Sequence, residues 1–165
     1  VVAMGKGGGG ELNVSSDLDL IYVYDSGGDT APHGAFSGTR ALSNHEFFER
    51  LGRRLAAALS ETTADGFVFR IDLRLRPNGD SGPLVVSSAM LEEYLVRQGR
   101  EWERFAWLKG RVISAPVLSD AAQFAMQVKA LTATVNPFVF RKYLDFNAIA
   151  SLRGLHEMIR AETQK

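Results

Sequence analysis

Two aspartates at the start of an apolar segment are the residues of this chain best suited to chemistry. Asp17 and Asp19 stand two positions apart in the sequence DLDLIYVY, whose hydrophobic content predicts a β-strand. Because strand side chains alternate between faces, both carboxylates point to the same side, with Cα atoms about 6.5–7 Å apart. Carboxylates beside apolar residues are costly unless a cation compensates them, and divalent cations take oxygen ligands readily. The pair therefore predicts a metal site.

A glycine-rich turn and two serines precede this acidic pair. We expect the backbone N–H groups of Gly8 and Gly9, together with Ser15 or Ser16, to hold phosphate, because glycine lets the backbone approach a ligand closely. The turn is no Walker loop, since no GK[ST] follows it, and a strand follows where the dinucleotide fingerprint requires a helix. Either feature alone would indicate an ordinary turn or two solvated acids. A phosphate cradle beside an acidic pair indicates nucleotidyl transfer.

A third carboxylate comes from the sequence FVFRIDLRLRP at residues 67–77, in which apolar and charged residues alternate. The alternation predicts a strand with one face in the core. The core face would carry Phe67, Phe69, Ile71, Leu73 and Leu75, and the other face Arg70, Asp72, Arg74 and Arg76. Asp72 would complete a three-carboxylate site for two Mg²⁺ ions, and the arginines would neutralise phosphate oxygens. The alternative is an edge strand with a solvated, salt-bridged face.

Four long segments of the chain resemble the glutamine synthetase adenylyltransferase family. They are GKGGGGELNVSSDLDLIYVY, FRIDLRLRPNGDSGPLVVS, QGREWERFAWLKGRVI and FVFRKYLDFNAIASLRGLHEMIR, and together they span most of the chain. Enzymes of this family add AMP to a tyrosine of glutamine synthetase and remove it, with two domains of the DNA polymerase β-like superfamily. In that superfamily a glycine turn precedes a strand with two alternating aspartates, and a later strand supplies a third.

Details of the motifs resemble the N-terminal, AMP-removing domain of the family. That domain has SGPLV and WER where the AMP-adding domain has GLLV and WEH, and this chain has SGPLV from Ser81 and WER from Trp102. The resemblance implies phosphorolysis of the tyrosyl–AMP ester to ADP, with Asp17, Asp19 and Asp72 as the catalytic and Mg²⁺-binding residues. One departure is Gly7, where the family has leucine. This extra glycine destabilises the turn by roughly 0.5–1 kcal/mol relative to alanine.

The implied partners are glutamine synthetase as protein substrate, ADP or ATP, phosphate, and the PII signal protein through the full-length enzyme. The reaction would regulate nitrogen assimilation. Three alternatives stay open: the AMP-adding half using ATP, a small-molecule nucleotidyltransferase, and a regulatory domain that binds nucleotide without turnover. The complete set of three acids argues against the last, because a binding module need not keep all of them.

Composition limits the other classes of function. The chain has 165 residues with 19 basic and 19 acidic side chains, so its formal net charge is zero and gives no electrostatic footprint for nucleic acid. It has no cysteine, which excludes disulfides and thiolate metal sites. No apolar run reaches transmembrane length, so we expect no membrane segment and a cytoplasmic location. The abrupt start with a strand-like VVAM indicates an excised domain.

The order of the predicted elements indicates an α+β fold, a polymerase β-like nucleotidyltransferase palm with a small mixed sheet and helices on one side. We expect the catalytic domain at residues 1–114 and a helical extension, the start of a larger helical region, at residues 115–165. Strands are expected at 1–4, 17–24 and 67–76, and residues 83–87 should pair with the last as a hairpin across the turn at 77–82. Residues 25–43 should form a loop over the site. One helix should begin after Ser43 or Asn44 as its cap. Two further helices should cover residues 88–98 and 101–112.

Overall fold

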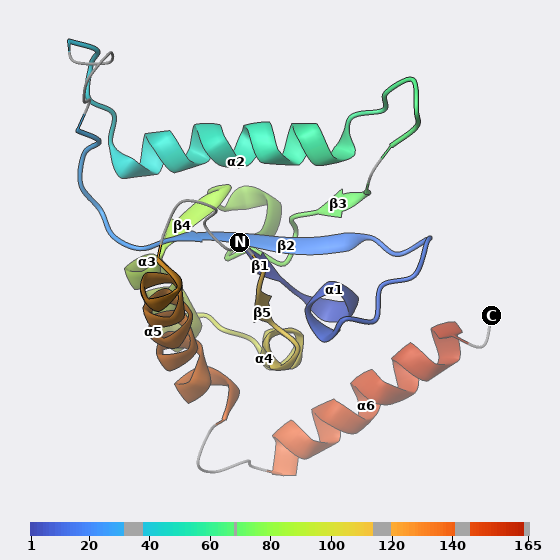
Figure 1. Cartoon of the computed structure of the whole chain (residues 1–165). Coiled ribbons are helices and arrows are strands. Elements are labelled where there is room, and N and C mark those ends of the chain that lie inside the picture. The colour runs from blue at the N-terminus through green and yellow to red at the C-terminus, as the bar shows by residue number, and fades with distance from the viewer. Residues whose placement is uncertain (32–37, 68, 114–119, 141–145, 164–165) are drawn as a thin grey trace.

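The computed structural model describes residues 1–31, 38–67, 69–113, 120–140 and 146–163. Its elements are β1 (Val2–Ala3), α1 (Gly5–Gly9), β2 (Leu18–Tyr24), α2 (Asn44–Ser60), β3 (Ile71–Asp72), the 3-10 turn η2 (Gly79–Ser81), β4 (Val85–Ser87), α3 (Ser88–Arg97), α4 (Glu101–Leu108), β5 (Arg111–Val112), α5 (Ala121–Val139) and α6 (Phe146–Thr163). This arrangement confirms the predicted α+β class with a small mixed sheet (Figure 1).

The sheet is built around β2. β1 pairs with β2 antiparallel, and β5 adds antiparallel to β1. β3 and β4 both pair with β2 in parallel, β3 along its first two residues and β4 along Tyr22–Tyr24. The predicted hairpin of residues 83–87 with the preceding strand is therefore wrong, because β4 takes β2 as its partner.

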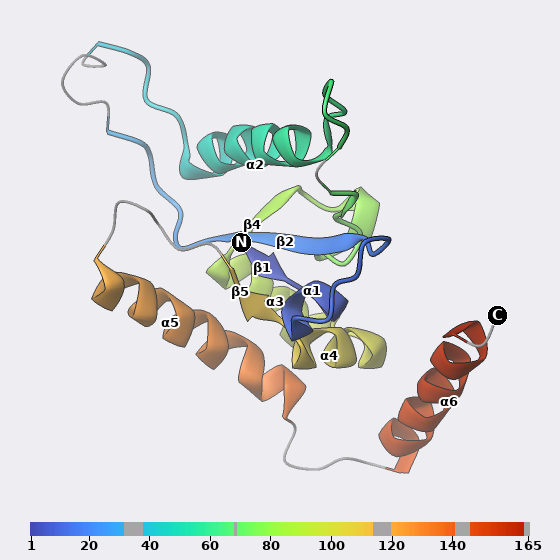
Figure 2. The same ribbon diagram turned by 45° about the vertical axis from the view of Figure 1, so that its right-hand side comes forward.

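Helices cover both faces of the sheet, so the expectation of helices on one side is also wrong (Figures 1 and 2). The alternation of β2 explains the two layers. Leu20 and Tyr22 lie in the core beneath α2, where Gly52 allows close approach: a Cβ there would lie 3.0 Å from the Tyr22 ring. Ile21 lies in the opposite core with residues of α3, α4 and α5, among them Leu91. Because α5 contributes to this core and packs against α3 and α4, part of the predicted helical extension shares the core of the sheet. The domain boundary at residue 114 stays a prediction.

The helix predictions succeed where local signals are strong. Ser43 caps α2, and its Oγ accepts the Glu46 N–H at 3.1 Å. α3 and α4 form as expected, although α4 ends at Leu108 and the following residues form β5. The glycine turn contains a feature that the sequence reading missed, because residues Gly5–Gly9 form the short helix α1. No helix among the described residues is long and apolar enough to cross a membrane.

The segment predicted to lie over the site begins at the other end of β2. It follows Tyr24, whereas the acidic pair lies where β2 begins, and Figure 1 shows the described parts of this segment extending away from that beginning. Thr30 N–H donates to the Leu42 carbonyl at 2.7 Å, which holds the two ends of the segment together. The described parts therefore do not cover the acids, and residues 32–37 lie outside the described chain.

Candidate active site

The three predicted acids come together where β2 begins. Asp17 lies immediately before β2, Asp19 lies within it, and Asp72 ends β3. The parallel register pairs Asp19 directly with Asp72, so the two acids occupy neighbouring positions on adjacent strands. This pairing joins residues that are far apart in the sequence, and it requires only two residues of β3.

The electrostatics of Asp19 show that the three acids act on one another. The pKa of Asp19 is raised, mainly because its carboxylate is partly buried, and then because of the negative charges of Asp72 and Asp17. The positive charge of Arg74 lowers it in part. Among the described residues, Asp19 has no basic ion-pair partner. The ionised form of Asp19 is therefore disfavoured in the protein as it stands.

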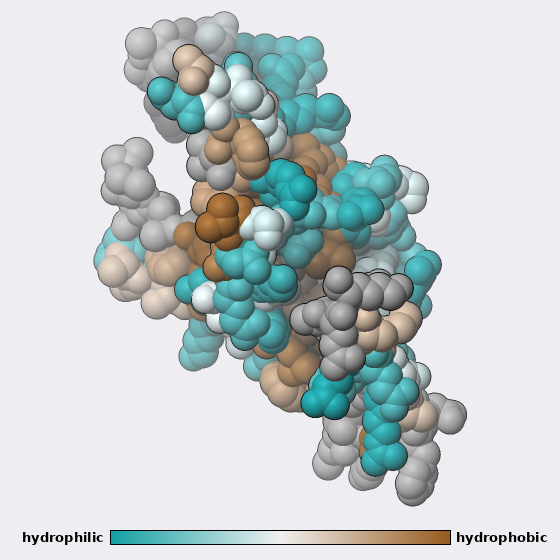
Figure 3. Space-filling view, turned by 90° about the vertical axis from the view of Figure 1, so that its right-hand side faces the viewer, coloured by the Kyte–Doolittle hydropathy of each residue, from teal (hydrophilic) through white to brown (hydrophobic). Residues whose placement is uncertain are grey.

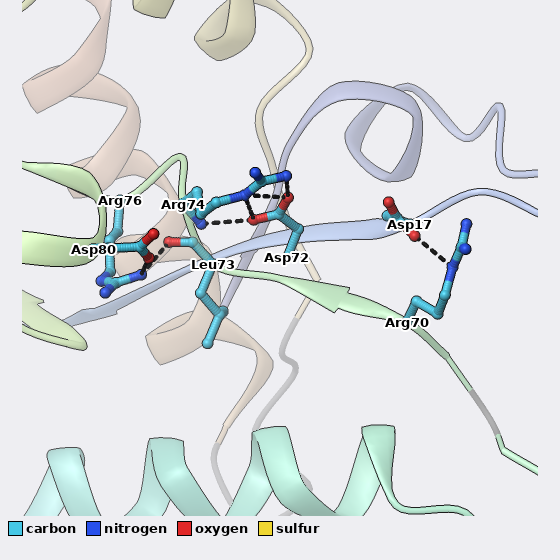
Figure 4. A network of polar contacts seen from close by, with 7 residues as sticks. All are labelled: Asp17, Arg70, Asp72, Leu73, Arg74, Arg76 and Asp80. Atoms are coloured by element: carbon cyan, nitrogen blue, oxygen red, sulfur yellow. Dashed lines mark hydrogen bonds and ion pairs between the residues drawn. The ribbon is translucent and has the colours of Figure 1, made fainter.

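Arginines hold the other two acids. Arg74 donates its backbone N–H to Asp72 Oδ1 at 2.8 Å, and its Nε donates to Oδ1 and Oδ2 at 3.0 and 2.9 Å (Figure 4). This bonding lowers the pKa of Asp72, chiefly through the Arg74 side chain. Arg70 Nε pairs with Asp17 Oδ1 at 2.7 Å, and Arg70 Nη2 donates to the Ser15 carbonyl at 2.7 Å. Two of the three arginines predicted to bind phosphate thus lie beside the acids.

The third predicted arginine lies elsewhere. Arg76 Nη1 donates to the Leu73 carbonyl at 2.7 Å and faces Asp80 at 3.4 Å. Figure 4 shows this pair apart from Asp17, with Asp72 between them. Only 12% of the Arg76 side chain is exposed, and its Nε is buried without a hydrogen-bond partner among the described residues. The structure therefore places Arg76 at the base of the turn that follows β3. Its phosphate role stays a prediction.

The glycines predicted to hold phosphate also have structural roles in the packing of α1. Gly8 N–H already donates to the Met4 carbonyl at 2.9 Å. A Cβ on Gly8 would lie 1.9 Å from the Lys109 carbonyl oxygen, so this residue is where α1 touches the backbone before β5. Gly9 ends α1. Arg111 Nε donates to the Gly8 carbonyl at 3.0 Å and secures the same contact.

The two predicted serines stabilise their own loop. Ser16 Oγ donates to Asn13 Oδ1 at 2.6 Å, and Ser15 Oγ donates to the same oxygen at 3.3 Å. These bonds close a turn that leaves Val14 fully exposed at its tip. Asx-type turns of this kind are common uses of serine and asparagine. Phosphate binding by Gly8, Gly9, Ser15 and Ser16 thus stays a prediction, beside a structural role that the contacts show.

Gly5 is a residue of the site that the sequence reading missed. It has a φ of +50° and begins α1, and a Cβ there would lie 3.0 Å from Asp19 Oδ2. Glycine is favoured at such a backbone conformation. A glycine before Lys6 was the available signal, but only the fold shows that it faces an acid.

The strand predicted over residues 67–76 is much shorter than expected. Only Ile71–Asp72 pair as β3, and Phe67 and Phe69 are exposed instead of lying in the core. Leu18 N–H donates to the Arg70 carbonyl at 2.8 Å and Phe69 N–H donates to the Leu59 carbonyl at 3.1 Å, so separate backbone hydrogen bonds hold the approach to β3. The apolar face predicted from alternation is therefore wrong for its first two members.

The exposed phenylalanines line a cleft beside the acids. It has a volume of about 440 Å³ and is bordered by Leu12, Asn13, Val14, Ser15, Ser16, Phe67, Phe69 and Arg70. Because Arg70 also pairs with Asp17, the cleft adjoins the site directly. Figure 3 faces the side of the molecule that lies to the right in Figure 1, and there hydrophobic residues lie among hydrophilic ones. The acids are thus next to an apolar surface that is open to solvent.

The acids fit a divalent cation in donor type and in backbone placement. Carboxylate oxygens are the ligands that Mg²⁺ prefers, and adjacent strands bring Asp19 and Asp72 side by side. Their side chains are not gathered around a common point: no three acids or histidines of the described chain are grouped closely enough to hold a metal as they stand. In the structure Asp17 and Asp72 are instead paired with the guanidinium groups of Arg70 and Arg74.

Replacing Asp19 by Asn should stabilise the free protein. In the folded state the pKa of Asp19 is raised above its ordinary value of 3.8, so the ionised side chain costs stability as pH rises through the folded pKa. Asp19→Asn should therefore raise the melting temperature at pH 7, and the gain should vanish at pH 3, where wild-type Asp19 is protonated in both states. Scanning calorimetry at both pH values measures this. Asp65→Asn, in an exposed turn, is the control, and a melting temperature lowered at pH 7 would contradict the repulsion.

Comparisons with known proteins identify the family of the chain. A family model described as glutamate-ammonia ligase adenylyltransferase matches residues 1–127. The whole chain is 59% identical to part of the bifunctional glutamine synthetase adenylyltransferase/adenylyl-removing enzyme of Ralstonia nicotianae, and 54% identical to part of that of Chromobacterium violaceum. It spans 16% and 17% of the lengths of these two relatives. The chain therefore belongs to the glutamate-ammonia ligase adenylyltransferase family.

Proposed function

We propose that this chain is the nucleotidyltransferase domain that removes AMP from adenylylated glutamine synthetase in the cytoplasm. The observation that supports this most is the register that pairs Asp19 with Asp72, next to Asp17. Carboxylates on neighbouring segments are suited to hold the metal ions that a two-metal displacement at phosphorus uses. The named activity of the relatives supports glutamine synthetase as the substrate. Because the relatives are about six times longer, the PII signal protein is proposed as a partner of the longer enzyme only.

The proposed reaction is a phosphorolysis. An oxygen of orthophosphate attacks the phosphorus of the tyrosyl–AMP ester, and the bond from that phosphorus to the phenolic oxygen breaks. The products are ADP and tyrosine, whose oxygen takes the proton that phosphate loses. We assign to Arg70 and Arg74, which lie beside the acids, the neutralisation of phosphate oxygens in this step, because guanidinium groups bind such oxygens with two parallel hydrogen bonds.

We propose Mg²⁺ as the cofactor, in two sites, with Asp17, Asp19 and Asp72 as its ligands. When bound, it would neutralise the charge that develops on the attacking and leaving oxygens of an in-line displacement. The pKa of Asp19 is raised first by burial and then by the charges of Asp72 and Asp17, and this supports the assignment because a bound cation compensates a partly buried carboxylate and relieves that repulsion.

The cleft beside Arg70 supports a protein as the substrate. A tyrosine carried on a loop of another protein needs an open approach, and this cleft is open and lined by exposed apolar side chains such as Val14 and Phe67. The direction of the reaction is supported by the motifs SGPLV and WER. The AMP-adding reaction with ATP is the second candidate, because the same acids could serve it.

The direction can be measured with purified glutamine synthetase in its two forms. With the adenylylated form, Mg²⁺ and phosphate, the chain should release ADP, because phosphate is its nucleophile. With the unmodified form, Mg²⁺ and ATP, it should transfer little AMP. The double variant Asp17→Asn/Asp19→Asn and an EDTA sample are the controls for both reactions. Faster transfer from ATP than release of ADP would assign the chain to the AMP-adding half and leave the acidic site unchanged.

A further inference from the structure

In the free protein, two exposed arginines form ion pairs with carboxylates of the site. The Arg74 side chain is 72% exposed, yet it bonds to both oxygens of Asp72, whose own side chain is 16% exposed. Arg70 is 62% exposed and pairs with Asp17. Long side chains with this much exposure can leave their partners with little loss of packing. These ion pairs thus hold the carboxylates in the free protein, and they are exposed enough for another cation to replace the guanidinium groups.

The same carboxylate oxygens would serve a divalent cation. A cation and a guanidinium group compete for them, because both are positive and both need the oxygen lone pairs. The charges of the site show the consequence. When all three acids are ionised, Asp17, Asp19 and Asp72 carry three negative charges and the two arginines carry two positive ones, which leaves at most one negative charge. A single divalent cation reverses that sign and makes the site attractive to phosphate.

We propose that Arg70 and Arg74 exchange partners, from the carboxylates in the free protein to phosphate when a divalent cation binds. The cation displaces the guanidinium groups from Asp17 and Asp72, and the released groups bind the phosphate oxygens. The cation and phosphate therefore bind cooperatively, and neither binds well alone. This inference rests on the proposed function, since it concerns the same acids and the same phosphate.

Arg76 does not take part in this exchange. Its side chain is nearly buried and donates to a backbone carbonyl. Breaking this contact would leave the buried guanidinium group without its hydrogen-bond partner, which is costly. Arg70 and Arg74 are exposed and can change partners, whereas Arg76 is nearly buried and has a structural role.

Calorimetric titration of the chain with Mg²⁺, with and without saturating inorganic phosphate, tests the exchange. A protein-free titration corrects for magnesium phosphate formed in solution. Phosphate should raise the affinity for Mg²⁺ by about 5- to 150-fold, the usual range of coupling between sites. By linkage, Mg²⁺ should raise the affinity for phosphate by the same factor. Equal affinity for Mg²⁺ in both titrations would overturn the exchange.

Arg74→Gln isolates the arginine from direct contact between cation and phosphate. Without the competing guanidinium group, Mg²⁺ should bind the phosphate-free protein about 2- to 5-fold more tightly, as expected from an exposed ion pair. The coupling with phosphate should fall by at least that factor, and Arg74→Lys should restore part of it. Arg53→Gln breaks a similar exposed pair with Glu49 on α2 and should change neither affinity.

Weaker or unchanged binding of Mg²⁺ to phosphate-free Arg74→Gln would show that Arg74 only supports Asp72, which overturns the exchange and leaves the metal site in place. Failure of Mg²⁺ to bind the wild-type chain even with phosphate would overturn the exchange and the proposed metal site together. Release of ADP from adenylylated glutamine synthetase is measured separately and reports on the proposed reaction itself.

Discussion

Asp72→Asn should lower the rate of ADP release on the order of 10²–10³-fold, the range seen when one preorganised electrostatic group is lost. The neutral amide keeps the shape of the side chain and still accepts the Arg74 backbone N–H, but it loses the charge opposite Asp19. The fold should survive at a small cost, because the lowered pKa of Asp72 comes mainly from its hydrogen bond with the exposed Arg74 side chain, and exposed ion pairs contribute little stability. Initial rates with adenylylated glutamine synthetase measure the effect, and the melting temperature should shift by only about 2–4 °C.

Asp65→Asn is the matched control, because it makes the same chemical change in an exposed turn near β3. Its rate should equal that of the wild type. A normal rate in Asp72→Asn would remove this residue from the site and leave β3 with a structural role only.

Gly8→Ala should destabilise the protein by about 3 kcal/mol or more, at the upper end of the cost of overpacking. The new Cβ would lie 1.9 Å from the Lys109 carbonyl oxygen and 2.6 Å from the Ala3 carbonyl oxygen, so α1 would have to move away from two backbone segments. Neither segment can yield as a flexible side chain does. Because domains are stable by only about 5–15 kcal/mol, the change should be plain in chemical denaturation.

Gly9→Ala is the neighbouring control. Its Cβ would meet only the ends of the Glu11 and Lys109 side chains at 3.3 Å, and these can move aside. Its unfolding midpoint should stay close to that of the wild type. Unchanged stability of Gly8→Ala, with weaker phosphate binding, would contradict the packing role and favour the phosphate cradle predicted from the glycines.

Features with a local cause could be predicted from the sequence. The alternation of β2 places its acids on one face and Leu20 and Tyr22 on the other, and the structure confirms this because a strand reverses its side chains at every residue. The start of α2 at its serine cap is local in the same way, since the Ser43 hydroxyl and the Glu46 N–H are three residues apart. The family also followed from contiguous motifs.

The alternating pattern gave wrong predictions where the length and direction of a strand depend on its pairing partner. Residues 67–76 have the pattern of a long strand, yet β3 pairs with β2 over two residues and leaves Phe67 and Phe69 exposed. Likewise β4 pairs in parallel with β2 instead of forming a hairpin. A strand's length and direction depend on which neighbour offers free N–H and C=O groups, and that neighbour is set by the whole sheet.

The chemistry of the site divides in the same way. The sequence by itself determined which residue types are present: three acids at strand spacing, arginines beside the third, and glycines before the first. Only the tertiary structure decided their partners. It pairs Asp19 with Asp72, gives Arg70 to Asp17 and Arg74 to Asp72, and sends Arg76 beneath a turn. The physical reason is that charge and backbone contacts act through space, so they also join residues such as Asp17 and Arg70 that are far apart along the chain.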